Sequence, residues 1–130
     1  MLPFIVELKP GLPITEQVIF AVKKAVVAGQ LRPGDAFPSV RALSQELKIN
    51  PNTAHKITAA LVAERVLIST PAVGTTVAEP AAGTREAKTE LLDDELERLV
   101  VEARKLGIPL DAVQSALTRH WKKFKGPSSK

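Results

Sequence analysis

Residues 38–53, PSVRALSQELKINPNT, contain two helix starts eleven positions apart. Ser39 stands directly before an apolar-periodic segment, where a serine hydroxyl accepts a hydrogen bond from a backbone N–H that has no helical partner. Asn50 is a second favoured cap, and Pro51 opens the next helix because proline at the first position loses only an unpaired N–H. The first helix therefore ends near Leu47. Two helices joined this tightly cross at a large angle, which predicts a helix-turn-helix.

A further helix is predicted ahead of this pair. After Pro13, apolar residues recur every four positions until Gly29, as on one face of a helix. These residues are Ile14, Val18, Val22 and Val26. The segment LRPGD at residues 31–35 then predicts a type II turn, because proline fixes φ at the first central position and glycine accepts a positive φ at the second.

A hairpin is predicted after the second helix of the pair. Residues 66–70 and 75–78 are rich in β-branched side chains, and residues 71–74 between them have turn chemistry. A two-stranded hairpin is marginal alone, so it must pack on the preceding helices. The helix that starts at Pro51 offers an inward face made of Ala54, Ile57 and Leu61. Three helices followed by a hairpin make a winged helix over residues 1–78.

Residues 79–84 are small and predict a linker to a two-helix tail over residues 85–130. The tail helices are expected to end near Leu106 and to run from about Leu110 to Phe124. Apolar residues in the first alternate spacings of four and three, as along the seam of paired helices. The second has an apolar row of Leu110, Val113, Leu117, Trp121 and Phe124. Because so small a hairpin cannot hold a core alone, we expect it to need a partner surface, and we assign it as a dimerisation tail.

The first helix carries apolar residues off its stripe, namely Ile19, Phe20 and Val27. We expect the tail helices, from the same chain or a partner, to cover them; the alternative is that the stripe is simply broad. The predicted dimer-interface residues are Phe20, Leu92, Leu96, Leu99, Val100, Ala103, Leu106, Leu117 and Trp121.

Composition excludes several classes of function. The 130 residues are too few for a large two-lobed enzyme, and no apolar run approaches the roughly 18 residues that span a bilayer. The first residues do not look like a secretion signal, so we expect the cytoplasm and no membrane contact. Without cysteine there are no disulfides or thiolate metal ligands. Neither His55 nor His120 has a second ligand nearby, and we expect no metal, no cofactor and no catalysis.

Charge is compatible with a polyanionic partner. The net charge is +4, and up to Ala78 there are eight basic and five acidic residues. Residues 119–130 hold five basic residues and no acid. The aromatic and basic cluster at residues 120–125 could contact the DNA backbone or an acidic membrane surface. The favoured interpretation is that it completes the tail core, with lysines suited to a helix C-terminus.

Four short segments form a specific combination. They are PITEQV at 13–18, GQLRPGD at 29–35, PSVR at 38–41 and NPNT at 50–53. Together they resemble the DNA-binding domain of the GntR family of bacterial transcription regulators, over about residues 12–78. The short tail looks like that of the YtrA-type subfamily, where two helices replace a large effector-binding domain. The resemblance implies a homodimeric repressor on an inverted-repeat operator in double-stranded DNA, with an unknown small-molecule effector.

The sequence departs from the family pattern at several positions. Lys48 and Arg65 stand where glycine is usual, at sites that favour a positive φ. The wing tip, residues 71–73, lacks the usual basic residue and keeps only the Gly74-Thr75 part of the pattern. His55-Lys56 replaces two common arginines. We therefore expect weak DNA contact by the wing, and an affinity that is lower and more dependent on pH than is typical.

The start of the second helix of a helix-turn-helix enters the major groove, where its first side chains reach base edges. Asn52 suits adenine or phosphate, and Thr53 suits phosphate or a thymine methyl. The family uses an arginine at the position of Arg41 for DNA and a serine at that of Ser39 for phosphate. The predicted DNA-binding residues are Ser39, Arg41, Asn50, Asn52, Thr53, His55, Lys56, Gly74 and Thr75.

Each of these roles has a structural alternative. The two asparagines can simply cap a helix, His55 and Lys56 can form a solvated face, and Arg41 can pair with Gln45 or Glu46. A winged helix that serves as a protein interaction module without reading DNA is the rival function, and the uncharged wing favours it.

Overall fold

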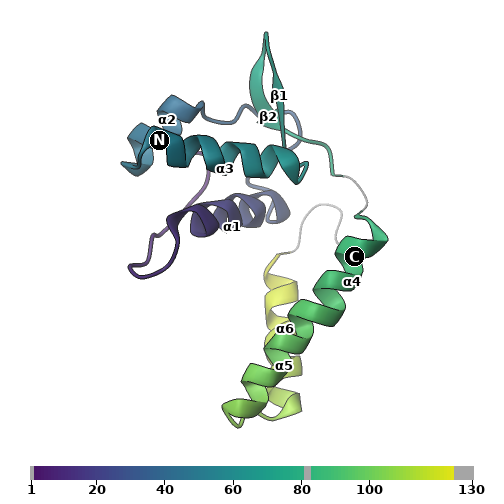
Figure 1. The fold of residues 1–130 in the computed structure, drawn as a ribbon. Coiled ribbons are helices and arrows are strands. Elements are labelled where there is room, and N and C mark those ends of the chain that lie inside the picture. Colours follow the sequence, from purple (N-terminus) through teal and green to yellow (C-terminus); the bar gives the residue numbers. More distant parts are fainter. Residues whose placement is uncertain (1, 81–82, 125–130) are drawn as a thin grey trace. The chain divides into compact units, whose positions relative to one another are not determined.

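The computed structural model of the chain describes residues 2–80 and 83–124 (Figure 1). After Pro80 the chain divides into two compact units, which we call the winged-helix unit and the tail unit and describe separately. In the described ranges, no helix has both the length and the apolar composition needed to cross a bilayer. The predicted linker at 79–84 and the tail end at 125–130 fall partly or wholly outside these ranges.

The winged-helix unit contains three helices and a hairpin. They are α1 (Ile14–Val27), α2 (Val40–Leu47), α3 (Pro51–Ala63), β1 (Leu67–Thr70) and β2 (Gly74–Val77). Figure 1 shows the hairpin projecting from one side of α3, with α1 on the other side. Helices α2 and α3 are the predicted helix-turn-helix, and the hairpin is its wing. The predicted fold class, mainly α with a winged helix-turn-helix and a C-terminal pair of helices, is confirmed.

The core of this unit lies between the three helices and the base of the wing. Val18, Val22, Leu43, Ile57 and Leu61 are fully buried in it. The predicted stripe on α1 is only partly right, because Ala21 and Ala25 complete the buried face while Ile14 is 40% exposed. A four-residue row drifts around a helix of 3.6 residues per turn, so its outer members turn away from the core.

The segment before α1 is an unpredicted part of the core. Phe4 is buried, and its ring stacks on Phe37 with centroids 5.8 Å apart and planes inclined by 3°. Gln17 holds the end of this segment: its Oε1 accepts from the Lys9 backbone N–H at 2.7 Å, and its Nε2 donates to the Lys9 carbonyl at 3.1 Å. Residues 2–9 thus pack as an arm on the winged-helix unit.

The turns have the predicted backbone. The Asp35 N–H donates to the Arg32 carbonyl at 3.0 Å, and Gly34 has a φ of 90°, as in a type II turn. Lys48 and Arg65 have φ values of 56° and 64°. Both positions therefore have the left-handed backbone expected from the family's usual glycines.

The wing is antiparallel, with Leu67 opposite Val77 and Thr70 opposite Gly74. Residues 34–37 pair with the other edge of β2, which the sequence did not reveal. Phe37 donates to the Thr75 carbonyl at 2.8 Å, and Val77 donates to the Asp35 carbonyl at 2.9 Å. This pairing anchors the base of the wing to the segment that leads into α2.

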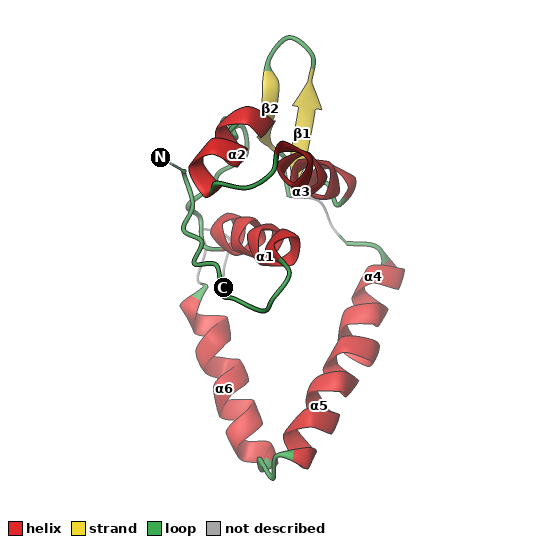
Figure 2. Cartoon of the chain, turned by 60° about the vertical axis from the view of Figure 1, so that its left-hand side comes forward, coloured by secondary structure: helices red, strands yellow, loops and turns green. Residues whose placement is uncertain are grey.

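The tail unit consists of α4 (Arg85–Thr89), a π-helical turn η1 (Glu90–Glu95), α5 (Leu96–Lys105) and α6 (Leu110–Lys123). The π-helical turn interrupts what was predicted as one regular helix. Figure 2 shows α5 and α6 diverging from the connection at residues 106–109. Ala103 is the only buried hydrophobic residue among the described tail residues. The apolar seam is therefore open along most of the hairpin.

Candidate nucleic-acid interface

The first turn of α2 is fixed by a helix cap and by buried residues on one face, while its other face is exposed to solvent. Ser39 caps the helix, since its Oγ accepts from the Ala42 N–H at 3.1 Å. Behind it, Leu43 is fully buried and the Ser44 hydroxyl donates to the Arg41 carbonyl at 2.9 Å. The Arg41 side chain is exposed, and no ion pair or hydrogen bond holds it within the described part of the chain. Its guanidinium is available to an anion.

The turn between the helices fixes where α3 begins. Lys48 takes the left-handed conformation, and the Ile49 N–H then donates to the Ser44 carbonyl at 3.0 Å. Asn50 caps α3 through its Oδ1, which accepts from the Asn52 N–H at 2.7 Å. The capping interpretation of Asn50 is therefore right, and only its Nδ2 remains for a further partner. Asn52 makes no such cap, so for it the capping alternative is wrong.

The front of α3 faces solvent. Asn52, His55 and Lys56 are exposed and Thr53 is half-buried, whereas Ala54 and Ile57 on the opposite face are fully buried. Among the described residues, no hydrogen bond or ion pair ties up these four front side chains. The helix is thus anchored by one face and presents polar groups on the other.

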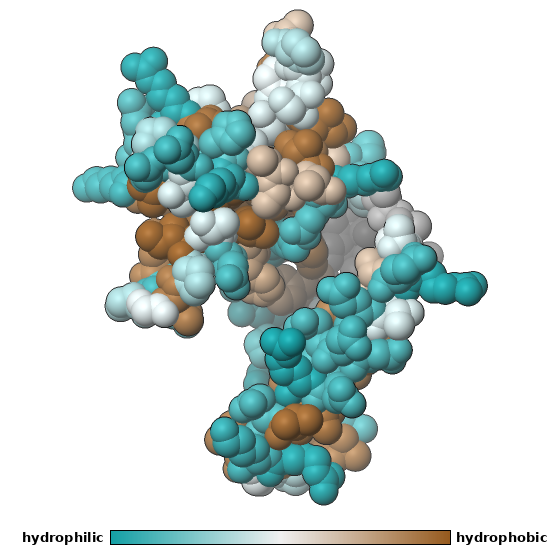
Figure 3. All heavy atoms as spheres, viewed as in Figure 1, coloured by the Kyte–Doolittle hydropathy of each residue, from teal (hydrophilic) through white to brown (hydrophobic). Residues whose placement is uncertain are grey.

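The wing contributes a surface of different chemistry. Residues 67–78 contain no charged side chain, and the hairpin is correspondingly pale in Figure 3, between hydrophilic and hydrophobic. Val73 at the tip is 71% exposed. Gly74 has a φ of 95°, and the place where a Cβ would stand is open. The Thr75 carbonyl already accepts a hydrogen bond from the Phe37 N–H. The wing can offer hydroxyl and apolar contacts but no cation.

These three segments belong to one compact unit, since α2 and β1 both contact α3. The predicted DNA-binding residues are thereby gathered on the helix starts and the wing. Sequence reasoning treated Lys48 only as a backbone departure, but it adds an exposed cation at the turn between the two helix starts. A basic residue between two helix caps was the signal that could have indicated it.

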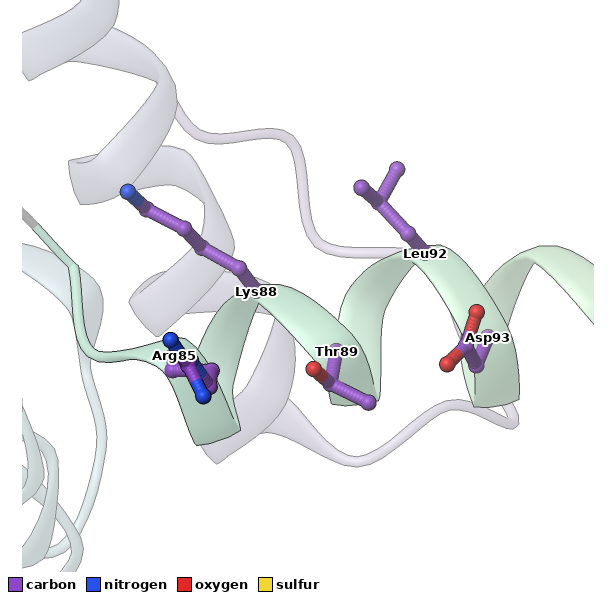
Figure 4. Close-up of a pocket in the computed structure, with 5 residues that line it drawn as sticks. All are labelled: Arg85, Lys88, Thr89, Leu92 and Asp93. Atoms are coloured by element: carbon purple, nitrogen blue, oxygen red, sulfur yellow. The ribbon is translucent and has the colours of Figure 1, made fainter.

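Two other kinds of site were considered in the described residues. These residues contain no group of three or more His, Asp or Glu side chains arranged to hold a metal ion. A shallow hollow on the tail is lined by Arg85, Lys88, Thr89, Leu92 and Asp93. Figure 4 shows these side chains on neighbouring turns of one helix, with Lys88 and Leu92 on the same side. All five are exposed and their charges are mixed, which does not suit a specific anion.

A winged helix-turn-helix with an exposed second helix is the architecture of a DNA-binding regulator. The family description "Bacterial regulatory proteins, gntR family" matches residues 14–77. The HTH-type transcriptional repressor YtrA of Bacillus subtilis (strain 168) is 34% identical over 100 residues, which cover 76% of this chain and 77% of the relative. The uncharacterized regulator YhcF of the same organism is 31% identical over 96 residues, or 74% and 79% of the two chains.

Solved structures show the same fold along the chain. A transcriptional antiterminator from Listeria monocytogenes EGD-e superposes with a TM-score of 0.84 at 24% identity, covering 98% of this chain and 96% of that one. YtrA from Sulfolobus acidocaldarius gives 0.52 at 21% identity, with coverage of 92% and 97%. The chain belongs to the GntR family and is a YtrA-like, DNA-binding transcriptional regulator.

Proposed function

We propose that this protein is a transcriptional repressor that binds an inverted-repeat operator as a homodimer. The observation that carries the proposal is the exposed front of α3, where the side chains of Asn52, His55 and Lys56 make no hydrogen bond or ion pair with residues 2–80 or 83–124. Such a regulator acts on the chromosome and therefore in the cytoplasm.

Base reading is assigned to the front of α3. Asn52 has an amide that can bond both the N6 and N7 groups of an adenine in the major groove. His55 and Lys56, one turn further, can donate to guanine O6 and N7 or to phosphate. Thr53 is half-buried, so part of its side chain is still accessible. Its methyl group suits a thymine methyl, and its hydroxyl suits a phosphate.

Phosphate contacts are assigned to the start of α2 and the turn. Ser39 accepts from Ala42 through Oγ, which leaves its hydroxyl hydrogen free to donate to a phosphate oxygen. Helix-start N–H groups strengthen such an anion site. Arg41 and Lys48 supply charge beside it. Neutralised phosphates release counterions, so affinity should fall as salt rises.

Dimerisation is assigned to the tail. Leu92, Leu99, Leu106, Leu117 and Trp121 are all exposed, and Trp121 is 74% exposed. An apolar surface of this extent on so small a unit marks an association site. In a two-fold dimer each copy contributes the same patch to the interface. The two-fold axis also relates the two α3 helices, which are the recognition helices, so that together they read an inverted repeat.

The predicted role of Phe20 also belongs to this proposal. Of the three off-stripe residues of α1, Ile19 is half-buried against the core, whereas Phe20 and Val27 are 65% and 55% exposed. We expect a second copy to cover them through Leu96, Leu99, Val100 and Leu106. Sedimentation of Phe20→Glu tests this part, because an unchanged dimer would remove Phe20 from the interface.

Repression would follow from occlusion of a promoter by the bound dimer. The YtrA relative is named a repressor, which supports this direction of control. A small effector, if the protein has one, would act by changing the dimer geometry.

Binding to DNA upstream of the protein's own gene tests the proposal. Fluorescence anisotropy at 50 and 200 mM salt should show specific binding that weakens by at least tenfold at the higher concentration. A shuffled DNA of equal length is the control. If neither DNA binds even at low salt, the protein is an interaction module and the repressor assignment fails.

A further inference from the structure

We propose that the tail dimerises with its two hairpins pointing the same way, so that the acidic segment of η1 and the first turn of α5 in each copy lies against the basic end of α6 in the other. The inference rests on the proposed homodimer and specifies its orientation. It is drawn from the distribution of charge along the hairpin.

The connection at residues 106–109 makes one end of the hairpin closed. The start of α5 and the end of α6 therefore both lie at the other, open end, where the helices have diverged (Figure 2). The linker to the winged-helix unit enters at the same end, because α4 and η1 lead directly into α5.

The two helical segments at the open end carry opposite charge. Residues 90–97 contain five acidic residues and no basic one, and residues 119–123 contain Arg119, His120, Lys122 and Lys123 and no acid. Among the described residues, no ion pair joins these segments within one copy. Each hairpin thus presents an acidic and a basic edge that are not neutralised internally.

These charges border the apolar seam. Asp93 follows Leu92 and Glu95 precedes Leu96, while Lys123 precedes Phe124. Charged residues at such bordering positions set the partner and the orientation of paired helices. The seam itself opens as a groove between α5 and α6, which has a volume of about 350 Å³. Its apolar lining includes Leu99, Ala103, Leu106, Val113, Ala116 and Leu117.

A second hairpin pointing the same way places its α6 beside this α5 in antiparallel fashion. Residues 119–123 of one copy then meet residues 90–97 of the other, twice per dimer by symmetry. In the opposite orientation the basic end of α6 would meet the closed end of the partner, where Arg104 and Lys105 are also basic. Like charges there oppose that arrangement.

The orientation has a functional consequence. Because the linker enters at the open end, hairpins that point the same way deliver both winged-helix units to one end of the bundle. Two recognition helices can then reach adjacent half-sites of one duplex. Opposed hairpins would start the two linkers from opposite ends.

Charge reversal in the full-length chain tests the orientation. One variant carries Asp93→Lys and Glu95→Lys, and the other carries Lys122→Glu and Lys123→Glu. Each alone brings like charges together, and we expect its homodimer to be about tenfold weaker by sedimentation equilibrium at low salt. Mixing the two should restore a one-to-one heterodimer, measured with one partner labelled.

The matched control is Arg104→Glu with Lys105→Glu, which makes the same charge change at the closed end. It should weaken the dimer less than either open-end variant, because the start of the partner's α6, residues 110–118, holds one charged residue, Asp111. If the control strengthens the dimer instead, and the mixture forms no heterodimer, the hairpins point in opposite directions and the inference is wrong. Circular dichroism verifies that each variant keeps its helices.

A second measurement needs no substitution. The wild-type dimer should dissociate more readily at 0.5 M than at 0.05 M salt, because the pairing charges are exposed. A dimer that is indifferent to salt overturns the charge pairing. A wild-type chain that stays monomeric at high concentration instead overturns the homodimer of the proposed function.

Discussion

Replacing Lys48 and Arg65 with glycine is expected to stabilise the winged-helix unit. Both residues have left-handed backbone, with φ of 56° and 64°, and such a conformation costs a residue with a Cβ roughly 1–2 kcal/mol. Glycine removes this cost but gains freedom in the unfolded chain, worth about 0.4–1 kcal/mol. The net gain is about 0.5–1 kcal/mol for each site. Both side chains are exposed, so little packing is lost.

Thermal unfolding followed by circular dichroism measures the effect. For a unit of this size, the double glycine variant should raise the Tm by about 5–10 °C. The matched control is Lys56→Gly, which places glycine inside α3 at ordinary helical backbone and should cost about 1 kcal/mol. If the double variant melts at or below the wild-type temperature, the left-handed strain argument is wrong for these two positions.

Three further predictions concern the DNA interface. Ser39→Asp keeps a good helix cap and should preserve the Tm, but its charge should repel phosphate and weaken DNA binding about tenfold or more in anisotropy titrations; equal losses of stability and binding would mean that Ser39 only caps. Arg41→Ala with His55→Ala should abolish specific binding and leave the fold intact, whereas Lys24→Ala on α1 should not; retained specificity would show that the contacts are misassigned. Val73→Lys should tighten binding and steepen the dependence of log K on log salt by about 0.9, one phosphate contact, if the wing tip reaches the backbone; an unchanged slope would place the tip away from DNA.

Local signals explain why much of the fold could be predicted. Ser39, Asn50, Pro51 and Gly34 each constrain the backbone within a few residues of themselves, so the helix starts and the turn could be read directly from sequence. The buried face of α3 followed from helical period in the same way. The left-handed conformation at Lys48 was expected from the resemblance, because glycine is usual at this position in the family.

Contacts between distant segments explain what was missed. Phe4 stacks on Phe37, and residues 34–37 pair with β2, across separations that no local pattern records. A row of residues at every fourth position turns gradually around a helix, and which end of the row leaves the core depends on the surface that the helix packs against. The spacing on α1 therefore could not show that Ile14 would be exposed. The π-helical turn at residues 90–95 has no local composition signal that we recognise, and its six residues include none of the usual helix breakers, glycine or proline.

The residues of the candidate site could be proposed from the sequence, but whether their side chains are exposed and unbonded could not. The sequence favoured Asn50 as the cap of α3 and left capping open as an alternative role for Asn52; the structure gives the cap to Asn50, so the side chain of Asn52 remains for a base. It also leaves Arg41 without an ion pair among the described residues. The tail leucines are exposed because the hairpin alone cannot bury them. This agrees with the expectation from its size that the tail needs a further surface to pack against.

Whether the front of α3 enters the DNA can be mapped at each backbone amide. Two-dimensional NMR of the labelled protein with the upstream DNA fragment would report which amides shift on binding. We expect the largest changes at residues 39–42 and 50–56, with smaller ones at the wing and almost none on the outer face of α1 around Phe20. Large changes confined to α1 or the tail, with the front of α3 unaffected, would contradict this expectation.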